Sequence, residues 1–141
     1  MKYLLDVNVL VALCVDEHEF HERVAAWVEQ SARAGRSELI TCAVTEMGFL
    51  RTLVQAEPYG FTIEQGKDLL SQLKSSKEFH FAFLSDGLGV ALLPRWVKGP
   101  KQITDGHLLG LAKAHGAEMA TLHERIPGAF VIPGKAERIA R

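Results

Sequence analysis

The sequence contains little cysteine and few aromatic residues. Only two cysteines, Cys14 and Cys42, occur in 141 residues, and aromatic side chains make up 8% of the composition. Neither cysteine has a partner at CxxC spacing, and both lie in apolar segments. This pattern predicts small buried core residues in a reducing compartment, with no need for a disulfide between them.

An excess of charge of one sign is also absent. The 16 lysine and arginine residues nearly balance 17 acidic residues, for a net charge of −1. A protein that held nucleic acid by bulk electrostatics should be basic. Any contact with RNA would therefore need a local patch or a bound metal ion.

A long apolar run is missing as well. No stretch reaches the roughly 18 apolar residues that a membrane span needs. The N-terminal segment begins with a lysine and apolar residues, but Asp6 and Asn8 interrupt it where a secretory signal avoids charge. We therefore expect a soluble cytoplasmic protein that does not use a membrane. Because 48% of the residues are apolar, residues 1–141 are predicted to form one domain with its own core.

Short apolar segments alternate with stretches of helical periodicity. Strands are expected at 3–5, 39–41, 79–83, 118–121 and 129–132. Helices are expected over 7–15, with Asn8 as the start signal, over 18–34, and from residues 43, 62 and 104 onward, with Gly116 ending the last. Residues 87–101 show no clear pattern. The alternation predicts an α/β fold with a parallel sheet covered by helices on both faces, and such sheets bind ligands at the carboxyl ends of their strands.

Three acidic residues occupy positions where a carboxylate is costly. Asp6 ends an apolar strand, and Asp105 lies one turn before two leucines on the same side of its helix. Glu46 adjoins the apolar stripe predicted for its own helix, which comprises Ala43, Met47, Leu50 and Val54. Buried carboxylates are stable at neutral pH only with a cation, and Mg²⁺ and Mn²⁺ both prefer oxygen ligands. The three acids together predict a divalent-metal site.

Each acid also has an ordinary structural explanation. Asp105 stands in the first helical turn after Thr104, where the helix dipole favours negative charge, and for this residue alone that is the better explanation. Glu46 fits an ordinary surface position on a helix about equally well. Asp6 could be a turn residue at a strand end. The metal-site hypothesis therefore rests on the set of three rather than on any one of them.

The same residues resemble a known family. A strand followed by Asp6-Val7-Asn8, then Thr45-Glu46 on a helix, then Ile103-Thr104-Asp105 is similar to the PIN domain. The stretch ITDGHLLGLAKAHGAEMAT, residues 103–121, is especially close to the VapC-type toxins of bacterial toxin–antitoxin pairs. The resemblance covers essentially the whole chain.

The resemblance implies a three-layer α/β/α fold with a mostly parallel central sheet, and Mg²⁺-dependent endoribonuclease activity on an RNA substrate. It also implies a small VapB-like antitoxin as partner and a toxin homodimer. Asp6, Glu46 and Asp105 match the metal-site acids of the family, which makes them the expected catalytic residues. Asn8 and Thr104 match its supporting polar positions.

The chain departs from the family at one place. A fourth acid usually follows the block that ends here in Thr121-Leu122, but this chain has His123 and then Glu124. A neutral imidazole is a poor Mg²⁺ ligand. The site could work with three acids, which we favour, or Glu124 could take the fourth place, or the preference could shift toward Mn²⁺. A catalytically weakened protein is a further alternative.

Other residues are weaker candidates for function. Arg51, Arg95 and Trp96 could contact RNA, although a tryptophan that packs a loop onto the core is the more ordinary explanation for Trp96. His18 and His21 have the spacing of a metal pair at a helix start, but no third ligand is near in sequence, so a surface position is favoured.

Three other functions compete with RNA cleavage. A phosphomonoesterase could use Asp6 as a nucleophile, but it needs an acid two residues on, where Asn8 stands. A weakened PIN-like domain could act only by binding a partner, as His123 suggests. A DNA nuclease is disfavoured because this chain is short and is not basic.

Overall fold

A parallel sheet forms the centre of the molecule. The computed structural model describes residues 1–33 and 36–134. In this part of the chain, five strands form one sheet in the order β3-β2-β1-β4-β5, and every neighbouring pair is parallel. The strands are β1 (Lys2–Leu5), β2 (Glu38–Cys42), β3 (His80–Leu84), β4 (Glu118–Thr121) and β5 (Phe130–Val131). Because the strands are parallel, their carboxyl ends lie along one edge of the sheet.

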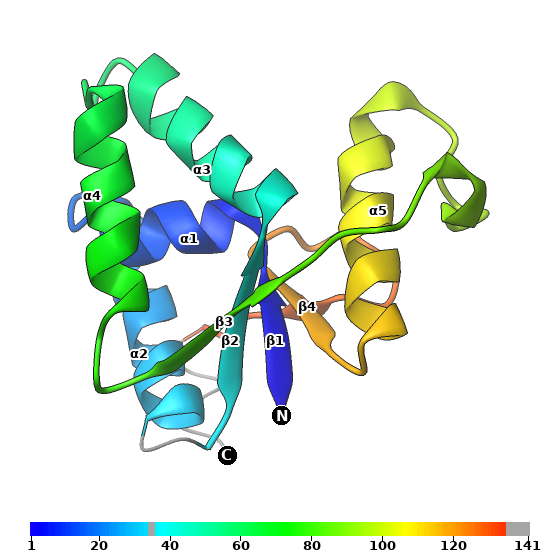
Figure 1. Cartoon of the computed structure of the whole chain (residues 1–141), viewed down its shortest axis with the longest axis horizontal. Helices are drawn as coiled ribbons and strands as arrows, with labels where there is room; N and C mark the ends of the chain where they lie inside the picture. Colours follow the sequence, from blue (N-terminus) through cyan, green and yellow to red (C-terminus); the bar gives the residue numbers. More distant parts are fainter. Residues whose placement is uncertain (34–35, 135–141) are drawn as a thin grey trace.

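Helices cover both faces of the sheet (Figure 1). They are α1 (Val7–Cys14), α2 (His21–Ala32), α3 (Ala43–Gln55), α4 (Ile63–Lys74) and α5 (Ile103–Ala114), with 3₁₀ turns η1 (Val90–Leu92) and η2 (Pro100–Gln102). The first four helices lie on one face and α5 lies on the other. Among these described residues, no helix is both long and apolar enough to cross a membrane. The predicted α/β architecture is confirmed.

Strand residues alternate between two cores, as the pleat requires. Leu5 and Leu39 belong to the core shared with α1, α2 and α3. Leu4 and Ile40, one residue away in each strand, belong to the core shared with α5. The inner strands β1, β2 and β4 are therefore buried on both sides, which is why they are mainly apolar runs.

Several predicted helix ends are confirmed by their caps. Thr62 caps α4, since its hydroxyl accepts from the Gln65 N–H at 3.1 Å and the Gln65 side chain accepts from the Thr62 N–H at 2.9 Å. Gly116 follows α5 with a φ of +68°, a left-handed conformation that favours glycine.

Cys14 and Cys42 are both free thiols, and burial raises the pKa of the Cys14 thiol to about 12.

Three sequence-based details are wrong. Asn8 does not start α1, because the carboxylate of Asp6 caps that helix instead. The helix expected to begin at His18 begins at His21, and its expected end at residue 34 lies outside the described residues. The stripe predicted for α3 does not form its buried face: Met47 is 63% exposed and Val54 is 40% exposed. The buried face consists of Thr45, Phe49 and Leu53. Phe49 and Leu53 belong to the core that α3 shares with α1.

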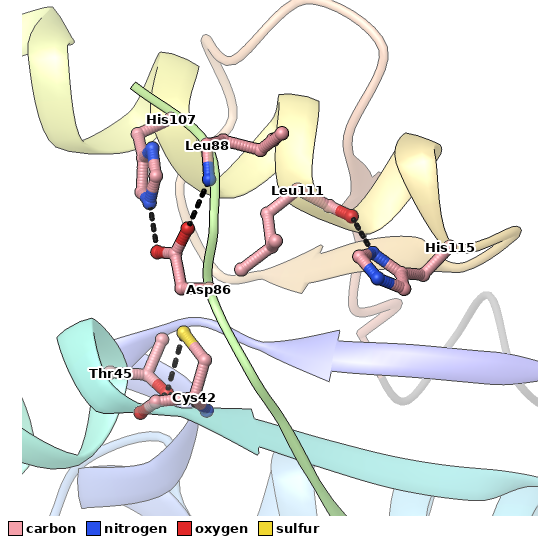
Figure 2. Close-up of polar contacts among 7 residues, drawn as sticks. All are labelled: Cys42, Thr45, Asp86, Leu88, His107, Leu111 and His115. Atoms are coloured by element: carbon pink, nitrogen blue, oxygen red, sulfur yellow. Dashed lines mark hydrogen bonds and ion pairs between the residues drawn. The ribbon is translucent and has the colours of Figure 1, made fainter. Parts of the chain in front are cut away.

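The segment between β3 and α5, where the sequence shows no clear pattern, is fastened to α5 by polar contacts (Figure 2). The Asp86 carboxylate pairs with the His107 ring on α5 and also accepts from the Leu88 N–H at 3.1 Å. Desolvation raises the pKa of Asp86, but these contacts outweigh it and hold that pKa below its ordinary value. Asp86 therefore stays ionised at neutral pH and helps to hold α5, which carries Asp105.

Gly106 sets how closely this segment approaches α5. A Cβ at Gly106 would lie 2.3 Å from Val97 Cγ2 and 3.3 Å from Pro94 Cδ, so alanine cannot fit without a shift. We expect Gly106→Ala to destabilise the protein by about 1–3 kcal/mol, measured by urea unfolding. Gly110→Ala is the matched control, because on the same helix its nearest neighbour is the Leu92 carbonyl at 3.8 Å. Adding Val97→Ala should restore much of the loss, and equal stability of both glycine variants would contradict the close approach.

Candidate metal centre

Asp6 lies where β1 ends and α1 begins, and both of its carboxylate oxygens are held. Its backbone is extended (φ −64°, ψ 160°), and Oδ1 accepts from the Val7 N–H at 2.8 Å. Oδ2 accepts from the Thr121 hydroxyl at 2.7 Å. The residue is only 7% exposed. The carboxylate is thus fixed in orientation at the carboxyl edge of the sheet, and it keeps lone pairs for a further partner.

Thr121, at the end of β4, connects the residues around Asp6. Besides donating to Asp6, its Oγ1 accepts from Asn8 Nδ2 at 3.5 Å and from the backbone N–H of His123 at 3.0 Å. This uses the one donor and both acceptor positions of the hydroxyl. Asn8 Oδ1 accepts in turn from the Leu122 N–H at 3.2 Å. The network ties the start of α1 to the end of β4, so the position of Asp6 depends on Thr121 and Asn8.

A cavity of about 320 Å³ at this edge brings Asp6 and Asp105 together. Asp105 reaches it from the first turn of α5. Asn8 and His123 also line it. The lining is completed by Val7, Val11, His18, Thr52 and Tyr59. Two carboxylates that are far apart in sequence therefore face one space at the ligand-binding edge of a parallel sheet.

The negative charges of the Asp6 and Asp105 carboxylates are only partly stabilised by the groups around them. Burial raises the pKa of Asp6, and the negative charge of Asp105 adds to that rise, although bonds from Thr121 and Val7 and the nearby His123 oppose it. The pKa of Asp105 is also raised, by desolvation, and His123 acts in the opposite direction there too. A cation placed between the two carboxylates would relieve both effects.

Glu46 has other partners. Its Oε2 accepts from the Thr41 hydroxyl at 2.6 Å and pairs with Lys74 Nζ at 2.6 Å. The Lys74 ammonium also lies 5.1 Å from the centre of the Phe83 ring. The side chain of Glu46 lines a separate, mainly apolar cavity of about 310 Å³ between α3 and α4, together with Met47 and Phe83. The structure therefore does not bring Glu46 together with Asp6 and Asp105.

The donors at the Asp6 cavity suit a hard divalent cation, which takes oxygen ligands. Within residues 1–33 and 36–134, however, no three Asp, Glu, His or Cys side chains are placed to hold one ion. The acids that meet are two, Asp6 and Asp105. Glu46, the third acid predicted from the sequence, pairs with Lys74 instead.

Residues 3–128 match the PIN domain family. The chain belongs to that family. Ribonuclease VapC44 of Mycobacterium tuberculosis is 33% identical over 141 residues, which cover 98% of this chain and 96% of that protein. Ribonuclease VapC29 of the same species is 34% identical over 125 residues, covering 86% of each chain, and ribonuclease VapC38 is 35% identical over 122 residues, covering 84% and 82%. The resemblance to VapC-type proteins is confirmed.

A solved structure supports the PIN-like fold. A chain in the crystal structure of VapBC2 from Rickettsia felis, bound to a DNA fragment from their promoter, matches with a TM-score of 0.60. The match covers 92% of this chain and 96% of that chain at 15% sequence identity. At that identity the likeness concerns the fold alone.

The remaining sequence-predicted residues lie outside the PIN-domain cavity that holds Asp6. Thr104 and Glu124 are exposed and do not line it. Arg51 and Arg95 are exposed as well. Trp96 is partly buried against the α5 core, as the ordinary explanation predicted, and it lines a separate cavity with Pro94, Leu109, Gly110, Lys113, Pro127 and Gly128.

Sequence reasoning missed Thr121, which hydrogen-bonds Asp6, and the polar residues His18, Thr52 and Tyr59, which line this PIN-domain cavity. Thr121 ends a strand at the ligand-binding edge, and its position in sequence could have identified it. His18 was assigned to the surface together with His21, but the two separate: His21 contacts the Ala12 carbonyl at 2.8 Å, whereas His18 lines the cavity. Thr52 and Tyr59 come from α3 and the loop after it. No local pattern marks them, because only the packing of α3 against α1 brings them there.

Proposed function

We propose that this VapC-family chain is a divalent-metal-dependent endoribonuclease, the toxin of a toxin–antitoxin pair. The supporting observation is the cavity that Asp6 and Asp105 both line. The pKa values of both carboxyls are raised, and within residues 1–33 and 36–134 no basic side chain is hydrogen-bonded to or ion-paired with either. Such a pair favours Mg²⁺ or Mn²⁺, and RNA supplies the phosphodiester that these ions activate.

Each residue has a defined task in this proposal. When bound, Mg²⁺ or Mn²⁺ would supply a Lewis acid for the phosphate oxygens and lower the pKa of water. Asp6 and Asp105 would hold the ion, and Glu46 would be a third ligand once separated from Lys74. Thr121 and Asn8 keep the Asp6 carboxylate oriented through their hydrogen bonds. Thr104 stands beside Asp105 as a supporting residue of the helix start.

Partners follow from the same family membership. We propose a small VapB-like antitoxin and a homodimer of this chain. Large apolar side chains remain exposed on the helices and near the sheet edge, which is common where proteins associate. They include Met47, Val54, Ile63, Phe83 and Ile103. Size-exclusion chromatography with light scattering, alone and with the antitoxin, measures both associations.

The direct test incubates purified protein with total RNA and maps new RNA ends. We expect cleavage with Mg²⁺ or Mn²⁺, none with EDTA, and recovery when metal is added back, because the two carboxylates cannot act on phosphate without a cation. Cleavage that persists in EDTA would contradict the metal site. Metal binding without any cleavage would favour the weakened, partner-binding alternative.

The phosphomonoesterase alternative is less well supported. Asn8 stands where such an enzyme needs an acid, and both polar groups of its amide are already engaged, with Thr121 and Leu122. Turnover of p-nitrophenyl phosphate by the same preparation would revive this alternative.

A further inference from the structure

Two histidines line the cavity of Asp6 and Asp105, and they are held in the same way. His18 lies in the loop between α1 and α2, and His123 follows β4. Nδ1 of His18 accepts from the Phe20 N–H at 3.0 Å. Nδ1 of His123 accepts from the Arg125 N–H at 3.2 Å. In each ring a backbone amide two residues onward occupies the Nδ1 lone pair.

These contacts determine where the ring proton lies. A nitrogen that accepts a hydrogen bond cannot carry the proton, so in each ring Nε2 carries it. A metal-binding imidazole needs the opposite arrangement, with a free lone pair toward the ion and a proton on the other nitrogen. His18 and His123 therefore offer N–H donors rather than metal ligands. His123 does not replace the missing fourth carboxylate as a ligand.

An N–H donor that lines this cavity can bind an acceptor that enters it. Asp6 already accepts from Val7 and Thr121, and the proposed function places a phosphate group beside it. Phosphate oxygens are strong acceptors for such donors. The backbone N–H of His123 donates to the same Thr121 hydroxyl that orients Asp6. The backbone from which the His123 ring extends is therefore held at a fixed place relative to the Asp6 carboxylate.

We propose that the Nε2–H groups of His18 and His123 bind the non-bridging oxygens of the RNA phosphate that is cleaved. This proposal rests on the proposed ribonuclease function. It explains how a chain without the fourth acid could still hold its substrate: the charge that a second metal ion would offset is met by two hydrogen-bond donors. The two histidines approach the cavity from different loops and would contact different oxygens of one phosphate.

The first measurement separates a donor from a ligand without using activity. Mn²⁺ binding to the RNA-free protein is measured from the electron paramagnetic resonance signal of the free ion. We expect His18→Ala and His123→Ala to keep Mn²⁺ affinity within about twofold of the wild type, whereas His123→Asp should increase it by adding a carboxylate. A tenfold loss of affinity in His123→Ala would make His123 a ligand and overturn the proposal.

The second measurement tests contact with RNA, using cleavage kinetics at saturating Mn²⁺. Losing a hydrogen bond to a charged oxygen should lower kcat/KM about tenfold in each alanine variant. Glutamine retains an N–H donor, so His18→Gln and His123→Gln should recover much of the loss. His115→Ala is the matched control, because that ring contacts the Leu111 carbonyl (Figure 2) and does not line the cavity.

The outcomes distinguish this proposal from the one on which it rests. If the wild type cleaves RNA and both alanine variants keep full kcat/KM, the phosphate contact is wrong and the ribonuclease function stands. If alanine and glutamine variants lose activity equally, the rings act through packing and the proposal fails. If the wild type cleaves no RNA, the proposed function fails and the phosphate contact fails with it.

Discussion

Replacement of Asp6 by asparagine is expected to lower RNA cleavage by more than about 100-fold. Loss of a residue that merely supports a metal ligand typically costs about 10–100-fold, and Asp6 is proposed as a ligand itself. Asparagine keeps the shape and can still cap α1, but it removes the negative charge that attracts the ion. Initial rates on an RNA oligonucleotide that contains a mapped cleavage site measure the effect. Asp105→Asn should show a loss of the same scale.

Stability measurements show whether these variants remain folded. The pKa of Asp105 is raised in the folded protein, so its ionised carboxylate destabilises the metal-free fold at neutral pH. Asp105→Asn should therefore keep or increase Tm in EDTA while it abolishes cleavage. Asp68→Asn, on the exposed surface of α4, is the matched control and should change neither property. Full cleavage by Asp6→Asn or Asp105→Asn would exclude the metal-site assignment.

The sequence predicted α5 and its acid well, because the helical period, the first-turn acid and the ending glycine all agree there. Leu108, Leu109 and Leu111 are buried as expected, and Asp105 lies one turn away at the cavity. Asp6 was placed for a similar reason: a short apolar strand that ends in an acid leaves little choice of where that acid lies. Both residues are positioned mainly by their own element.

The sequence was less informative about features that depend on how two elements pack together, such as the buried side of α3 and the partner of Glu46. The apolar residues of α3 suggested a stripe through Met47 and Val54, but Phe49 and Leu53 are the residues buried in the core that α3 shares with α1. Apolar residues lie on more than one side of this helix, so periodicity alone cannot select the buried side. The partner of Glu46 was equally hidden, because Lys74 lies 28 residues away and on another helix.

The histidines illustrate the same limit. Their spacing suggested a pair of His18 with His21, yet packing turns these rings apart and brings His18 to a cavity with His123. His123 stands where the resemblance to the family led us to expect a fourth acid. The tautomer of its ring is set by a local backbone contact, and that contact is visible only in three dimensions.

The second large effect on RNA cleavage is expected from replacement of Glu46. If Glu46 joins Asp6 and Asp105 around the ion, Glu46→Gln should lower cleavage by more than about 100-fold, for the same reason as Asp6→Asn. Its position supports this proposal: α3 begins directly after β2, and β2 lies beside β1, so the first turn of α3 shares the sheet edge with Asp6. The effect is measured as the cleavage rate at saturating Mn²⁺ and as Mn²⁺ affinity without RNA.

Lys74 then becomes a competitor of the metal ion, and this gives the prediction an independent check. Lys74→Met should increase Mn²⁺ affinity, because Glu46 no longer has to leave an ammonium group. It should also cost about 1 kcal/mol of folding stability, since the two side chains are only 28% and 24% exposed and water screens their attraction in part. Lys67→Met is the matched control: on the same helix, Lys67 pairs with Glu64 at 3.6 Å, and these side chains are 61% and 79% exposed. If Glu46→Gln cleaves RNA normally and Lys74→Met binds Mn²⁺ no more tightly, Glu46 only fastens α3 to α4, and the ion is held by Asp6 and Asp105 without it.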